Sequence, residues 1–156
     1  TDNLRESLEN CEANFATKFS AEASETVHRV GALNSRLLGI ATKFTSDANS
    51  ADDLSKMLED LAQAATSAQE VHLDQKSLIA NTNYSSLLRV QSGIRLLRAS
   101  IKSALARNES RGVHLRSDFA EENPELIHHI TVDNEDNVGT LAVRKGQKDN
   151  WILAPQ

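Results

Sequence analysis

The chain has 156 residues and a net charge of −5, and 39% of its residues are hydrophobic while only 4% are aromatic. This is long enough for one domain with a real core, which must consist mainly of aliphatic side chains. The acidic balance argues against nonspecific nucleic-acid binding, which needs clustered positive charge. The only cysteine, Cys11, excludes a disulfide within the chain and argues against a Cys-based zinc site.

The N-terminal region is polar and acidic, and it lacks the hydrophobic stretch of a signal peptide. No apolar run approaches the ~20 residues that span a bilayer, so we expect no direct membrane insertion. The composition fits the reducing cytoplasm. Because the chain begins at Thr1 rather than Met, we expect a processed chain or an excised piece of a longer one.

The first helical region is predicted in residues 1–46. Apolar residues recur there every three or four positions, the spacing of one buried helix face. They are Leu4, Leu8, Cys11, Phe15, Phe19, Val27, Val30, Leu33, Leu37, Ile40 and Phe44. The pattern fits one long helix, or two helices with a break near residues 20–24. Gly31 and Gly39 weaken a helix here, or else they allow close packing between helices.

Two more helices are predicted after a polar break at residues 45–50. Ser50 is a good N-cap for the first of them, with Asp53 placed as in a capping box. Its apolar face is Leu54, Met57, Leu58, Leu61, Ala65, Ala68 and Val71. Residues 74–83 form a connection, and residues 81–83 offer N-caps for a helix that runs to about Asn108. The inward residues of that helix are Leu87, Leu88, Ile94, Leu97, Ile101 and Leu105, and Gly112 is its expected stop.

After Gly112 the pattern changes to that of strands. Residues 126–132 and 139–144 are rich in strand formers and flank a turn at 134–137, which predicts a hairpin. His128 and His129 then point to opposite faces and cannot share a metal in the usual way. Residues 145–156 are expected to be a polar tail.

The predicted fold is mainly α. An up-and-down bundle of three to four helices, similar to a spectrin repeat, occupies residues 1–112. An extended segment, a small β-hairpin appendage and the tail follow in residues 113–156, within the same domain. The sequence has no G-x-G-x-x-G, no P-loop, no H-E-x-x-H and no C-x-x-C motif. We therefore assign no catalytic, cofactor-binding or metal-binding residue.

Charged residues are most crowded in the segment 103–118. They are Glu109, Arg111, His114, Arg116 and Asp118, all within ten residues around Gly112. An arginine can hold a carboxylate or a phosphate with two parallel hydrogen bonds, and a histidine can titrate near neutral pH. The simplest interpretation is a helix C-terminus tied down by salt bridges.

This segment also carries a resemblance to a known family. The residues 103–107 (SALAR), 109–112 (ESRG), His114, Arg116 and Asp118 fit the pattern A-x-x-R-x-E-S-R-G-x-H-x-R-x-D. The pattern resembles that of the C-terminal domain of succinate dehydrogenase and fumarate reductase flavoprotein subunits, and of L-aspartate oxidases. The family usually continues D-Y-P-E, where this chain has D-F-A-E at 118–121. The resemblance covers residues 77–144, and Arg116 favours the succinate/fumarate branch.

The resemblance implies a fragment of an oxidoreductase that uses FAD to move a hydride to or from a C4 dicarboxylate. In such proteins the FAD site and the acid/base residues lie upstream, so we expect this chain to hold no FAD and to be inactive alone. Its implied partners are the flavin-binding and capping domains of the parent, with an iron–sulfur subunit as a further one. The five charged residues named above would lie toward the flavin domain. The implied location is the cytoplasm, with the cytoplasmic face of a membrane complex as a variant.

A different class of function stays open from the sequence. The spacing in residues 1–46 also suits a stand-alone helical module that binds protein partners. That alternative predicts an apolar helix face that is exposed in the monomer or buried in a dimer.

Overall fold

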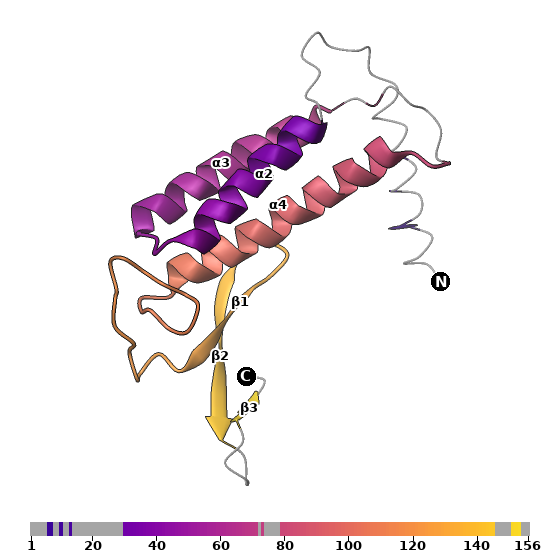
Figure 1. Cartoon of the computed structure of the whole chain (residues 1–156). Coiled ribbons are helices and arrows are strands. Elements are labelled where there is room, and N and C mark those ends of the chain that lie inside the picture. The colour runs from indigo at the N-terminus through magenta and orange to yellow at the C-terminus, as the bar shows by residue number, and fades with distance from the viewer. Residues whose placement is uncertain are drawn as a thin grey trace.

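A computed structural model describes residues 6, 7, 10, 13, 30–71, 73, 79–145 and 151–153. Its elements are α2 (Val30–Ser46), α3 (Ala51–Gln69), α4 (Thr82–Ala106), β1 (His128–Val132), β2 (Val138–Lys145) and β3 (Trp151–Leu153). The three helices lie side by side, and the strands extend away from the bundle beside the C-terminal part of α4 (Figure 1). The mainly helical fold with a hairpin is thus confirmed. Most of residues 1–29, with Cys11 and the choice between one helix and two, lie outside the described residues, and so do residues 74–78 of the connection at 74–83.

The core lies where α2, α3 and α4 meet. Its most deeply buried side chains are Leu54, Met57, Leu61, Leu87, Val90 and Ile101. The close approach of two helices occurs at Gly93 of α4, where an added Cβ would lie 2.7 Å from Leu37 Cδ2 of α2. The suggestion that Gly31 and Gly39 serve close packing is therefore wrong, because nothing lies within 4 Å of a Cβ at either position.

The start of α3 follows from its sequence. Ser50 Oγ accepts a hydrogen bond from Asp53 N at 3.2 Å, and the Asp53 carboxylate accepts one from Ser50 N, which completes the predicted capping box. Asp52 and Asp53 add negative charge at the positive end of the helix dipole. The predicted face is also confirmed, since Leu54, Met57 and Leu61 are buried.

Helix α4 begins at the predicted cap and ends earlier than predicted. Asn81 Oδ1 accepts from Tyr84 N at 2.9 Å. The helix ends at Ala106, just before the predicted end at about Asn108, because Arg107 adopts an extended ψ of 114°. Gly112 is not the stop; it lies in a later turn with a φ of +61°. The prediction that Leu88 faces inward is also wrong, because Leu87 and Val90 take the buried face and leave Leu88 44% exposed.

The strands form one antiparallel sheet in the order β1-β2-β3. The predicted hairpin is present, and its turn is closed by Asp133, whose carboxylate accepts from the backbone of Glu135 and Asn137. His128 is half-buried and His129 is exposed, as expected for alternating faces. The expected polar tail is not wholly a tail, because residues 151–153 pair with β2 as a third strand. Among the described residues, no helix combines the length and the apolar character needed to cross a membrane.

Candidate functional site

The charged segment folds into a compact loop at the C-terminal end of α4, here named the arginine loop (residues 107–119). Glu109 lies at its centre and is fully buried. Arg111 forks onto its carboxylate, with Nε 3.1 Å from Oε1 and Nη2 2.9 Å from Oε2. Arg107 pairs with Oε1 as well, and Asn123 N donates to Oε2 at 2.8 Å. The buried negative charge is therefore fully paired, which is the condition for burying it at all.

The Glu109 carboxyl group is ionised at neutral pH in this setting. Its hydrogen bond from Arg111 lowers its pKa from 4.5 to about 2, with help from Asn123 N and Arg107. Burial acts in the opposite direction and is outweighed. Because the group stays ionised, it links the two arginines into one cluster over the whole neutral pH range.

A tight turn gives the arginine loop its shape. Arg111 N donates to His114 O at 2.9 Å, and His114 N donates to Arg111 O at 3.0 Å. Gly112 adopts its positive φ at this turn, which a residue with a Cβ rarely does. Below the turn, Ser110 Oγ accepts from Arg116 N at 2.8 Å and donates to Phe119 O at 2.7 Å.

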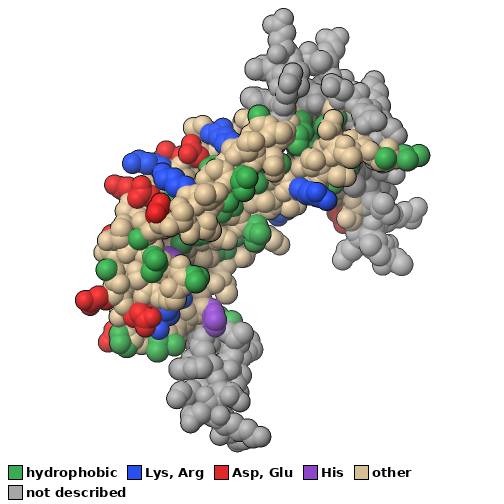
Figure 2. Space-filling view, in the orientation of Figure 1, with side chains coloured by type: hydrophobic (Ala, Val, Ile, Leu, Met, Phe, Trp, Pro, Cys, Tyr) green, Lys and Arg blue, Asp and Glu red, His purple; other side chains and the backbone are tan. Residues whose placement is uncertain are grey.

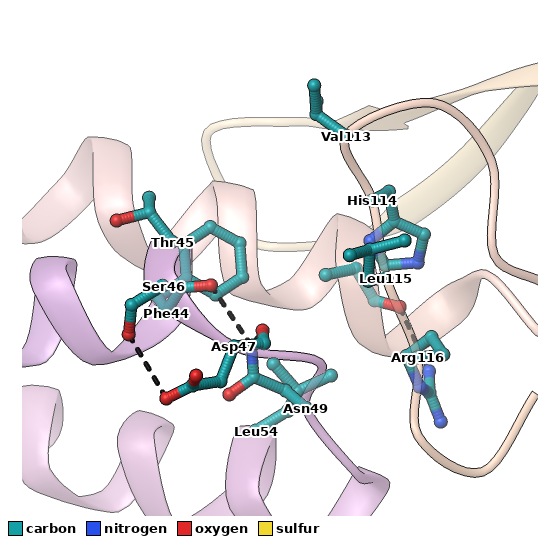
Figure 3. Close-up of a pocket in the computed structure, with 11 residues that line it drawn as sticks. Phe44, Thr45, Ser46, Asp47, Asn49, Leu54, Val113, His114, Leu115 and Arg116 are labelled. Carbon is teal, nitrogen blue, oxygen red and sulfur yellow. Dashed lines mark hydrogen bonds between the residues drawn. The ribbon is translucent and has the colours of Figure 1, made fainter. Parts of the chain in front are cut away.

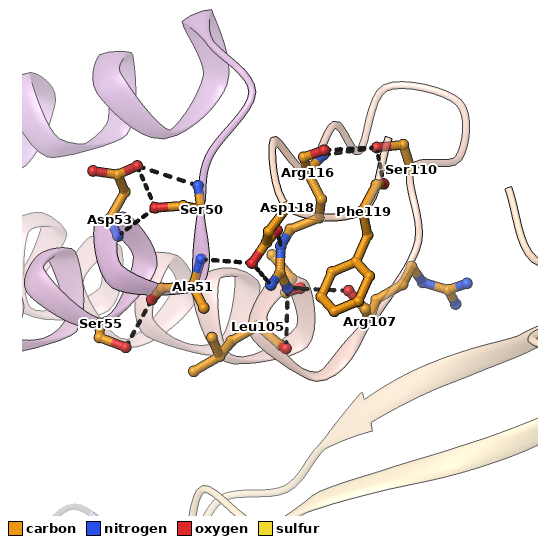
Figure 4. Close-up of polar contacts among 11 residues, drawn as sticks. Ser50, Ala51, Asp53, Ser55, Leu105, Arg107, Ser110, Arg116, Asp118 and Phe119 are labelled. Atoms are coloured by element: carbon orange, nitrogen blue, oxygen red, sulfur yellow. Dashed lines mark hydrogen bonds and ion pairs between the residues drawn. The ribbon is translucent and has the colours of Figure 1, made fainter. Parts of the chain in front are cut away.

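Arg116 ties the loop to the helices (Figure 4). Its Nη1 donates to the carbonyl oxygens of Ala104, Leu105 and Arg107 at 3.0–3.1 Å, so it caps the C-terminal end of α4. Nε and Nη2 fork onto Asp118 at 2.7 and 2.6 Å. The guanidinium also lies 5.1 Å from the centre of the Phe119 ring. The positive charge thus stands at the negative end of a helix dipole, where it is favoured.

His114 borders a cavity of about 260 Å³ between the arginine loop and the end of α2 (Figure 3). The side chains of Phe44, Thr45 and Ser46 stand across the cavity from it. Burial lowers the pKa of His114, and the charges of Arg107 and Arg116 lower it further. Its Nε2 is buried and makes no hydrogen bond to any residue that the structure describes. A neutral imidazole with one unpaired nitrogen therefore sits at the edge of the cavity.

Apolar side chains cover the outside of the same end of the molecule. Val113 at the tip of the turn is 102% exposed and Leu115 is 52% exposed. Phe119 and Ile127 are also exposed. Figure 2 shows hydrophobic side chains gathered at this end beside acidic ones, and Val113 and Leu115 also line the cavity beside His114 (Figure 3). The arginine loop therefore has paired charges in its interior and several apolar side chains on its surface.

The comparison with protein families decides what this domain is. Residues 39–152 match the family model of the fumarate reductase flavoprotein C-terminus, and they include the whole arginine loop. The chain belongs to this family. No curated protein matches the sequence.

Solved structures agree with this assignment at the level of the fold. A mutant FrdA subunit of Escherichia coli quinol fumarate reductase superposes with a TM-score of 0.67 at 16% identity, over 96% of this chain. The Sdh1 complex of Mycobacterium smegmatis, without ligand and with UQ1, superposes with a TM-score of 0.66 at 15% identity, also over 96%. This fumarate reductase flavoprotein C-terminal domain spans only 24% of the FrdA chain and 23–24% of the two Sdh1 chains.

The five predicted interface residues do come together in this C-terminal domain, but at different depths. Glu109 and Arg116 are buried inside the chain, with exposed fractions of 0% and 2%. Arg111 and His114 are half-buried, and Asp118 lies at the surface between Arg116 and α3.

Three further residues of the site were not predicted. Arg107 donates to Glu109 and to the carbonyl oxygens of Leu126 and His128, which joins the loop to the sheet. Ser110 supplies the hydroxyl described above. Both stand within the recognised motif, which was the available signal. Asn49 was missed entirely: its side chain donates to Phe44 O and Asp47 O, and its backbone pairs with the loop. Among the described residues, no group of His, Cys, Asp and Glu could hold a metal ion.

Proposed function

We propose that this chain is the C-terminal helical domain of an FAD-dependent oxidoreductase of the fumarate reductase and succinate dehydrogenase type, acting on a C4 dicarboxylate. Family membership supports the proposal, and so does the short span of the chain against the flavoprotein subunits it resembles. The flavin and the reacting groups belong to the upstream part of the parent. The domain alone binds no FAD and catalyses no turnover. Its parent acts in the cytoplasm, or at the cytoplasmic face of a membrane complex.

The structural part of the proposal rests on the exposed apolar side chains of Val113 and Leu115 on the arginine loop, here named the apolar rim. Val113 and Leu115 make the direct contact with the flavin-binding and capping domains, and Arg111, His114 and Asp118 lie beside them. Glu109 and Arg116 act indirectly, because they are buried and only hold the loop in shape. The unpaired Nε2 of His114 supports this assignment, since buried polar groups normally have a partner.

The loop and strands act as one unit with the helices. The arginine loop caps α4 through Arg116, pairs with Asn49 after α2, and reaches β1 through Arg107. These links support a single domain over residues 1–112 and 113–156. An iron–sulfur subunit is a further partner of the parent in this proposal.

Flavin binding and turnover on the purified chain test the first part. We expect no flavin absorbance after incubation with FAD and no fumarate or succinate turnover with an artificial electron carrier. Robust activity of the chain would overturn the proposal. The reading frame of the parent gives a second check, because a G-x-G-x-x-G motif must lie upstream of residue 1.

Charge substitutions at the rim test the interface. In the full-length parent, Val113→Asp and Leu115→Asp should release FAD and lower turnover at least tenfold, because a charge cannot be buried there without a partner. Val138→Asp is the matched control, since Val138 is 45% exposed but lies on β2. In the isolated chain all three variants should unfold at the wild-type urea concentration. Equal activity of the rim variants and the control would contradict the assignment.

A further inference from the structure

Two hollows lie along α4, away from the arginine loop. They are separated by a ridge that carries Arg95 and Arg98. The first hollow, of about 420 Å³, lies between α3 and α4 and has Ala65, Ala68 and Ile94 among its walls. The second, of about 530 Å³, lies between α4 and the β1–β2 turn. Both are lined by Ser92, Arg95 and Arg98. The two hollows together are named the α4 groove.

The charges of the α4 groove are unequally satisfied. Arg98 pairs with Asp136 at 2.5 Å, and Lys102 reaches the same carboxylate at 3.5 Å. The other acid of the groove, Asp133, is held by its own turn through Asn137. Arg95 has no ion pair with any residue that the structure describes. Within the part of the chain that the structure describes, Arg95 between the two hollows therefore has no counter-charge, although the net charge of the sequence is −5.

Apolar surface accompanies this free charge. Leu88, among the walls of the first hollow, is 44% exposed, and Leu96, among those of the second, is 72% exposed. Leu88, Arg95 and Lys102 are spaced by seven residues and so share one face of the helix. A segment that crosses the ridge would meet the apolar walls of the first hollow, then Arg95, and then a second hollow in which Leu96 and Val132 stand beside Asp133 and Asp136.

We propose that the α4 groove binds an acidic segment of a second polypeptide, with a carboxylate forked onto Arg95 and an apolar side chain in the first hollow, whose walls hold no acidic residue. Arginine with a carboxylate is the favoured ion pair at protein interfaces, because its planar group makes two parallel hydrogen bonds. This contact is separate from the flavin-domain interface at the arginine loop. The inference rests on the proposed function in one respect, which is that the parent protein works within a larger assembly.

Photo-crosslinking in the full-length parent tests the inference. A photo-crosslinking amino acid at Ser92, between the hollows, should join the parent to a separate polypeptide, at a peptide that contains Asp or Glu. Arg95→Glu should lower the crosslink yield at least tenfold, and Arg95→Gln by a smaller factor. Arg89→Glu is the matched control, because Arg89 is an exposed arginine of α4 that does not line either hollow. Changing the crosslinked Asp or Glu to Lys should restore the yield in the Arg95→Glu parent.

Several results would overturn the inference. They are no crosslink, a crosslink only within the parent chain (residues 1–29 included), a crosslinked peptide without a carboxylate, or equal losses for Arg95→Glu and Arg89→Glu. Folding is checked separately by urea unfolding of each variant of the chain. If Arg95→Glu does not fold, Arg95→Gln decides alone, and an unchanged yield then counts against the proposal. Because flavin content is measured in the same parent, failure here is distinct from failure of the flavoprotein assignment.

Discussion

Arg116 and Asp118 form a forked ion pair that joins the C-terminal end of α4 to the N-terminal end of α3. Arg116 caps the last carbonyl groups of α4, while Asp118 Oδ2 accepts from Ala51 N at 3.0 Å. Each charge therefore stands at the helix end whose dipole favours it. The pair acts as a clasp between two helices, and it fixes the arginine loop at the same point.

Removal of the arginine from this clasp should be costly. We expect Arg116→Met to lower the free energy of unfolding by about 3–5 kcal/mol, because three carbonyl groups at the end of α4 lose their donor and Asp118 loses its ion-pair partner. Asp118→Asn should cost less, about 1–3 kcal/mol, because the amide oxygen can still accept from Ala51 N and Arg116 keeps its three carbonyl acceptors at the negative end of α4. Urea unfolding followed by circular dichroism measures both. If both variants lowered the free energy of unfolding by the same small amount, the ion pair would not stabilise the contact between α3 and α4.

The central carboxylate of the loop should be as sensitive as the clasp. Glu109→Gln keeps the shape of the side chain but leaves Arg107 and Arg111 around a neutral group. We expect a loss of about 3–5 kcal/mol in the free energy of unfolding, as for other broken buried ion pairs. Glu122→Gln is the control: its ion pair with Arg111 is largely exposed, so its loss should stay below about 1 kcal/mol. A control loss as large as that of Glu109→Gln would contradict this account.

The two carboxylates also make stability depend on pH in the acid range. Paired with Arg111 and Arg116, Glu109 and Asp118 have pKa values of about 2 in the folded chain, against ordinary values of 4.5 and 3.8. The unfolded chain therefore binds more protons between these limits. The stabilisation is fully present above pH 4.5 and is lost as the pH falls toward 2. Urea unfolding at several pH values should show this decline, and the gap between wild type and Asp118→Asn should narrow with it.

Two glycines should respond to alanine in opposite directions. At Gly112 the backbone has a φ of +61°, so Gly112→Ala should lower the free energy of unfolding by about 1–2 kcal/mol. Gly39 lies on the exposed side of α2 with free space around it. Gly39→Ala should therefore raise the free energy of unfolding by about 0.5–1 kcal/mol, because alanine favours the helix. Urea unfolding of both variants decides, and a gain at Gly112 would refute the role of that turn.

Local patterns in the sequence determined the elements of this protein. The spacing of Leu54, Met57 and Leu61 placed the buried face of α3, and Ser50 with Asp53 fixed its start. The strand formers on both sides of the turn at 134–137 indicated the hairpin. These features depend on residues within a few positions of one another, which is why they can be read from the chain. The motif around Glu109 and Arg116 likewise carried the family resemblance.

The tertiary structure alone decided how the charges are used. Asp118 meets Ala51 across 67 positions of sequence, and no local pattern indicates such a contact. The same holds for the end of α4, which stops at Ala106 and has its carbonyl groups capped by Arg116. Leu88 lost its predicted place in the core to Val90 for a similar reason, since the side of α4 that is buried depends on where α2 and α3 pack. Sequence periodicity gives the faces of a helix, but only packing decides which neighbour each face meets.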